Sequence, residues 1–92
     1  MKNKKEDIKL VIRKILFYDW DPLIVSTAIN VEDEYDSFIV PVERFLAQHP
    51  SVDQIVGFLR DIEINELSGS VNDENNLHTA ALKLYELSKS FN

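Results

Sequence analysis

Apolar residues recur at helical spacing in four stretches of the chain. A helix on the surface of a globular protein places apolar residues three and four positions apart and charged residues on its other face. The pattern predicts helices from Lys4 to about Tyr18, from the acidic cluster at 32–36 through Leu46, from Ser51 to about Leu67, and from Leu77 to Phe91. We therefore expect an all-α fold, a small bundle of about four helices around one core.

Prolines mark where the first two helices end and begin. Pro22 disfavours helical backbone at Asp21 before it, so the first helix should end near Trp20. Pro41 is tolerated in the first turn of a helix but not farther inside it. The second helix should therefore either begin near Val40 or have an earlier turn that is kinked there.

The third helix carries both a start signal and a stop signal. Ser51 followed three residues later by Gln54 has the pattern of a capping box, and Gly69 suits a left-handed C-terminal cap. Between the first two helices, the apolar run at 23–31 is too short for its periodicity to distinguish a strand, a helical turn and a loop. We therefore expect one irregular segment near 21–35.

The chain has the size and composition of a single domain. Its 92 residues are too few for two independent cores, and 45% apolar residues with 2 Gly and 3 Pro indicate a globular chain with little loop. The absence of Cys excludes disulfides, thiolate metal sites and a Cys nucleophile. Neither an export signal nor a run of about 18 apolar residues is present. We expect one cytoplasmic domain over residues 1–92 and no membrane partner.

The formal charge of −6 is unevenly distributed along the chain. Residues 1–14 carry six basic and two acidic side chains, a net charge of +4, whereas residues 15–92 carry four basic and fourteen acidic ones, a net charge of −10. An acidic field attracts basic protein surfaces and repels phosphates. Although the basic first helix could neutralise several phosphates, we expect a basic protein partner and no nucleic-acid partner.

No arrangement of catalytic residues is recognisable. Nucleophilic catalysis needs a nucleophile, a base and an orienting group together, and the two histidines, His49 and His78, are explained more simply as helical residues. The two glycines, Gly57 and Gly69, cannot form a phosphate-binding loop, which requires several glycines at fixed spacing. We predict a protein that is not an enzyme and that has no cofactor.

The numerous carboxylates raise the question of a metal site. Asp19 with Asp21, or the run at 33–36, could supply the oxygen ligands that Mg²⁺ and Ca²⁺ prefer. Their spacing lacks the alternating ligands, the central Gly and the terminal Glu of a calcium loop. A solvated acidic run that caps a helix explains these residues more simply, so we predict no metal site.

The segment Tyr18-Asp19-Trp20-Asp21-Pro22 combines aromatic and acidic side chains. Trp and Tyr contribute large binding energies at interfaces, and carboxylates select the charge of a partner. The single Trp of a small domain is more simply a core residue. The two interpretations are compatible if one edge of the indole is exposed.

Two motifs resemble those of a known family. Asp19-Trp20-Asp21-Pro22 at a helix end and Asp33-Glu34-Tyr35-Asp36-Ser37-Phe38, followed by Pro41, are similar to segments of a family of short bacterial helical proteins of uncharacterised function, in which two further helices complete the chain. The order of helices matches over nearly the full length. Members of that family occur beside genes for interbacterial toxins, so the resemblance implies a toxin-neutralising immunity role. It carries over no catalytic residue.

These observations lead to one expected function and two alternatives. We expect a non-enzymatic protein-binding module, most concretely an immunity protein whose acidic surface docks on a basic, nuclease-type toxin. The alternatives are a small carboxylate metal-binding protein or hydrolase, and a structural subunit or homodimer that uses surplus apolar surface around Phe38, Phe58 or Phe91. The predicted partner-binding residues are Asp19, Trp20, Asp21, Glu32, Asp33, Glu34, Tyr35 and Asp36.

Overall fold

The computed structural model describes residues 4–21, 35–66 and 74–91. Within these ranges every regular element is a helix, which confirms the predicted all-α fold. The elements are α1 (Lys4–Lys14), the π-helix η1 (Ile15–Trp20), the 3-10 helix η2 (Asp36–Phe38), α2 (Ile39–Leu46), α3 (Val52–Asn65) and α4 (Glu74–Ser88). The irregular segment expected near 21–35 lies almost wholly outside the described residues. No helix in the described ranges is long and apolar enough to span a membrane.

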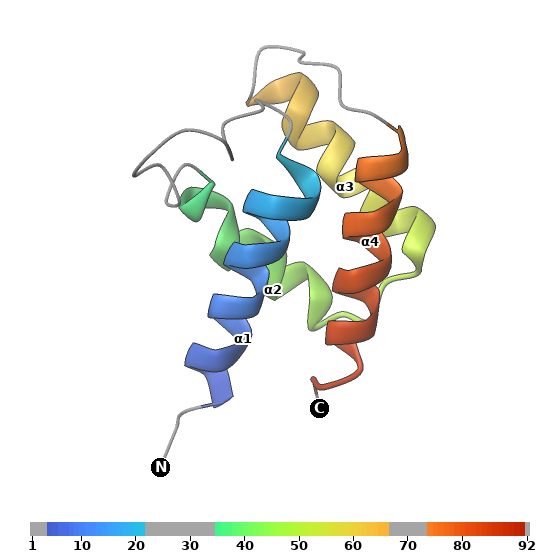
Figure 1. Ribbon diagram of the computed structural model, residues 1–92. Coiled ribbons are helices and arrows are strands. Elements are labelled where there is room, and N and C mark those ends of the chain that lie inside the picture. Colours follow the sequence, from blue (N-terminus) through green and yellow to red (C-terminus); the bar gives the residue numbers. More distant parts are fainter. Residues whose placement is uncertain (1–3, 22–34, 67–73, 92) are drawn as a thin grey trace.

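The helices pack around one core (Figure 1). α1 packs against α2, its continuation η1 packs against α4, and α4 also contacts α3 and α2. From η1, α1 and α4 diverge toward the end of the bundle at which α1 begins and α4 ends (Figure 1). The first helix therefore packs against α4 mainly through the π-helix.

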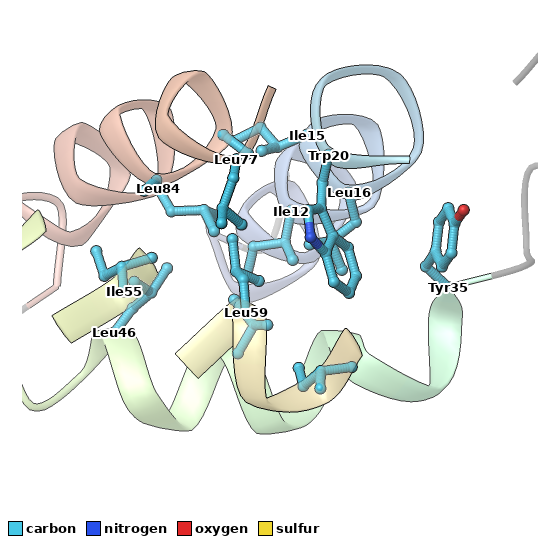
Figure 2. Close-up of a cluster of buried hydrophobic side chains, with 14 of the residues drawn as sticks. Ile12, Ile15, Leu16, Trp20, Tyr35, Leu46, Ile55, Leu59, Leu77 and Leu84 are labelled. Atoms are coloured by element: carbon cyan, nitrogen blue, oxygen red, sulfur yellow. The ribbon is translucent and has the colours of Figure 1, made fainter. Parts of the chain in front are cut away.

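The core draws on all four α-helices and on η1. Figure 2 shows apolar side chains from these elements gathered in one cluster that includes the indole of Trp20. Besides Trp20, five large aliphatic side chains are wholly buried: Ile12, Leu16, Leu46, Leu59 and Leu84. Burial of one such side chain stabilises a fold by roughly 1.5–3 kcal/mol. The helical spacing of apolar residues in the sequence predicts these positions because each helix buries one stripe of its surface.

The local signals at the start of α2 and α3 act as predicted. η2 supplies the earlier turn before α2, and Pro41 stands in the first turn of α2, where its missing N–H removes no intrahelical hydrogen bond. At α3, the Ser51 Oγ accepts from the Gln54 N–H at 3.2 Å, and the Gln54 Oε1 accepts from the Ser51 N–H at 2.9 Å. This confirms the capping box, which satisfies two N–H groups that have no partner within the helix.

A left-handed residue closes the connection from α2 to α3. His49 has a φ of 55°, its N–H donates to the Leu46 carbonyl at 2.9 Å, and Pro50 follows in a buried position. Left-handed backbone is strained for a residue with a Cβ and is more often occupied by Gly. His49 thus lies just beyond α2 and does not extend it. The predicted cap at Gly69 lies outside the described residues.

α4 begins and ends earlier than the apolar spacing predicts. It runs Glu74–Ser88, whereas the spacing predicts a helix from Leu77 to Phe91. After the helix, the Phe91 N–H donates to the Ser88 carbonyl at 3.1 Å in a tighter turn, and the Phe91 ring packs partly buried on the core.

Candidate functional site

The first helix ends in a π-turn that sets the direction of the residues around Trp20. The Asp21 N–H donates to the Leu16 carbonyl, five residues back, at 2.9 Å. Asp21 itself is left-handed, with φ 35° and ψ 58°, a conformation that Asp adopts more readily than most residues. As a result Trp20 is wholly buried while Tyr18 is 63% exposed. Short π-helical turns are frequent at functional sites, so this helix end is the natural place to look for one.

The indole of Trp20 is held by a buried carboxylate. Its Nε1 donates to the Oε2 of Glu63, on α3, at 2.8 Å, and Glu63 is only 2% exposed. A buried carboxylate is costly unless it is hydrogen-bonded, and a buried indole N–H usually finds an acceptor. The bond therefore joins η1 to α3 within the core.

A second buried hydrogen bond joins Asp21 to Tyr35. The Tyr35 Oη donates to the Asp21 Oδ1 at 2.8 Å, and both residues are buried. The Tyr35 ring lies beside the Trp20 indole, with ring centroids 5.4 Å apart (Figure 2), and the Phe38 ring approaches the indole edge-on at 6.0 Å. The aromatic and acidic residues of the two sequence motifs thus pack on one another.

Two other carboxylates of the candidate set form ion pairs. Asp36 accepts from the Arg13 Nε at 2.9 Å and from Nη2 at 2.5 Å, a two-point contact between η2 and α1. Asp19 accepts from the Lys83 Nζ, on α4, at 3.0 Å. The Asp36 and Asp19 side chains are 35% and 22% exposed, so part of each carboxylate faces solvent. The charge that they offer to a partner is partly neutralised within the chain.

The predicted partner-binding residues therefore fall into three groups. Three are buried, in line with the interpretation of Trp20 as a core residue: Trp20, Asp21 and Tyr35. Two are partly exposed: Asp19 and Asp36. Three lie outside the described residues: Glu32, Asp33 and Glu34. In this structure the buried group has almost no surface for a partner to contact, and partner binding by the set as a whole stays a prediction.

Sequence reasoning missed the partners of these residues. Glu63 carries a recognisable signal, because it follows Leu59 by four positions and so lies on the same face as the apolar stripe of α3. A charged residue on an apolar face is rarely buried unless it is paired. Arg13 and Lys83 carry no such signal, because they lie 23 and 64 residues from their acidic partners along the chain.

An open groove lies between the first helix and α4. It has a volume of about 670 Å³ and is lined by residues of α1, η1 and α4. Its apolar walls include Val11, Tyr18 and Leu82, which are 40%, 63% and 44% exposed. The Lys83–Asp19 ion pair connects its two sides.

The described residues contain no grouping suited to hold a metal ion. No three His, Asp or Glu side chains within 4–21, 35–66 and 74–91 come together as ligands. Both histidines are exposed, His49 just after α2 and His78 on α4.

Comparison with known proteins leaves the family of this chain open. No protein-family model matches it, and neither a curated protein nor a solved structure matches it significantly. The resemblance to the bacterial helical family therefore stays a prediction from the two motifs. The function has to be argued from the described residues.

Proposed function

We propose that this protein is a non-enzymatic protein-binding module, most concretely an immunity protein that neutralises a basic, nuclease-type bacterial toxin through an acidic surface. The observation that carries the proposal is that three carboxylates, on α3 and at its end, are exposed and form no ion pair with a described residue. Asp53, Asp61 and Glu66 are exposed, and none of them forms an ion pair with another described residue. Their negative charge is available to a partner, whereas that of Asp19 and Asp36 is partly neutralised by ion pairs within the chain.

The mechanism is occlusion of the surface with which the toxin holds its substrate. A nuclease must be basic to bind phosphates, so an inhibitor with a net charge of −10 over residues 15–92 is steered toward that surface. Electrostatic complementarity of this kind raises the association rate and selects the partner. Glu32, Asp33 and Glu34 add to this net negative charge, and the last two belong to one of the two family-like motifs.

The proposal is tested by capture and then by reconstitution. The tagged chain is used to pull down proteins from its native bacterium at low and at moderate salt, and bound proteins are identified by mass spectrometry. A basic partner that elutes as salt rises is then purified, and its nucleic-acid cleavage is measured with and without the chain. We expect stoichiometric inhibition and an association rate that falls steeply with ionic strength.

A charge variant and a neutral control locate the surface. The triple variant Asp53→Asn, Asp61→Asn, Glu66→Gln should associate about tenfold more slowly and inhibit less. The control, Gln48→Ser with Thr79→Ser, changes exposed neutral residues and should behave like the parent chain. Equal inhibition by the triple variant, or a partner that is itself acidic, contradicts the proposal.

A further inference from the structure

The apolar stripe of the first helix leads, at its next position, to an acidic residue. Ile8, Ile12 and Ile15 follow one another at spacings of four and three, and all of them pack in or against the core. Asp19 stands four residues beyond Ile15. In an unbroken α-helix residues at these spacings share one face. Asp19 would then enter the core, where a carboxylate without a hydrogen-bond donor is costly.

The π-turn of η1 removes Asp19 from that stripe. The Asp21 N–H donates to the Leu16 carbonyl, five residues back, at 2.9 Å, so the turn encloses one residue more than a turn of α-helix. The next residue, Trp20, therefore takes the core position and is 0% exposed. The Asp19 side chain is 22% exposed and accepts from the Lys83 Nζ at 3.0 Å.

Two carboxylates favour this pairing of the backbone, which we call the π register, over the pairing four residues back, which we call the α register. Asp19 stays at the edge of the core only in the π register. Glu63, 2% exposed, accepts from the Trp20 Nε1 at 2.8 Å and loses this donor if the indole turns away. A buried acceptor without its donor destabilises the fold.

We propose that η1 is a two-register element, held in the π register by the polar side chain at position 19 and returned to the α register by an apolar one. In the α register residue 19 fills the core position, and Trp20 is rotated about the helix axis by about 100°, the turn of one residue. The indole then leaves Glu63 and lies at the edge of the core, where a partner can contact it. No exposed carboxylate of α3 takes part, so this proposal holds or fails independently of the immunity proposal.

The variant Asp19→Leu tests the register directly in the full chain. Nuclear magnetic resonance detects scalar couplings across hydrogen bonds and so identifies the acceptor of the Asp21 N–H. We expect the coupling to the Leu16 carbonyl to be lost and replaced by one to the Phe17 carbonyl, four residues back. The fluorescence of Trp20 should shift to longer wavelength, because the indole leaves the interior. If Asp19→Leu does not fold, Asp19→Met offers the core a more adaptable side chain and gives the same test.

Two control variants separate the polarity of residue 19 from its ion pair. Asp19→Asn keeps a polar group that is costly to bury, and Lys83→Met removes the ion pair but keeps the carboxylate. Both should retain the coupling between the Asp21 N–H and the Leu16 carbonyl. The proposal is overturned if a folded apolar variant also retains that coupling. It is equally overturned if Lys83→Met loses the coupling, because the ion pair and not the core position would then set the register.

Discussion

The hydrogen bond from Trp20 to Glu63 allows a quantitative test of how the core is held together. Trp20→Phe leaves the Glu63 carboxylate, 2% exposed, without the donor 2.8 Å away. A buried acceptor that loses its donor costs about 1–3 kcal/mol, and the smaller ring adds the cost of a cavity. In a domain of this size about 1 kcal/mol corresponds to about 4–8 °C in the melting temperature, so we expect a fall of about 10–20 °C.

A double-mutant cycle separates the hydrogen bond from the cavity. Glu63→Met removes the carboxylate and keeps a side chain of similar length. In the parent chain this substitution leaves the indole N–H without an acceptor. In the Trp20→Phe background it removes a carboxylate that already lacks its donor, so it should lower the free energy of unfolding less there. We expect a coupling energy of about 1–3 kcal/mol between the two substitutions.

Urea unfolding followed by far-ultraviolet circular dichroism measures all four proteins of the cycle. Asp61→Asn, an exposed change on the same helix, is the control and should alter the free energy of unfolding by no more than about 0.5 kcal/mol. If the two core substitutions are additive within about 0.5 kcal/mol, the hydrogen bond contributes nothing measurable and the reasoning is refuted.

Substitutions at three further positions test local features by thermal unfolding. Tyr35→Phe removes the buried hydrogen bond to Asp21 and should cost about 1–3 kcal/mol; an unchanged melting temperature would show that the hydroxyl is dispensable. His49→Gly relieves the left-handed φ of 55° and should raise stability by about 0.5 kcal/mol, since relief of strain exceeds the added backbone entropy of the unfolded chain; a lower melting temperature contradicts this. Ser51→Ala removes the acceptor of the Gln54 N–H and should cost about 1 kcal/mol, whereas Ser51→Asp should not, because Asp also caps helices; equal losses from both would argue against the cap.

The helices were predictable because their signals are local. Ile55, Leu59 and Ile62 recur at helical spacing, and such a stripe has to be buried wherever the helix packs. The Ser51 and Gln54 pair is three residues apart, so both halves of the capping box are visible in the sequence. Pro41 likewise restricts its own neighbourhood. The local structure at these residues depends little on the rest of the fold.

The candidate site was less predictable because its environment is made by distant residues. Asp21 and Tyr35 are residue types common at binding surfaces, yet both are buried and form a hydrogen bond with each other. A carboxylate can be buried when a donor meets it, and no spacing within the motif shows that the donor is present. The π-turn at Ile15–Trp20 is also undetectable from periodicity, since it is shorter than the window in which a period can be measured.

Trp20 is the sole tryptophan of the chain, and its burial gives the protein a built-in optical reporter. The indole touches the Tyr35 and Phe38 rings and the Glu63 carboxylate, so its fluorescence should be that of a water-excluded group. A partner that separates η1 from the residues packed on it, in order to contact Asp21 or Tyr35, should expose the indole to water and shift its emission to longer wavelength. A partner that settles in the groove beside Tyr18 should leave the emission wavelength where it is, so one spectrum distinguishes the two modes of recognition.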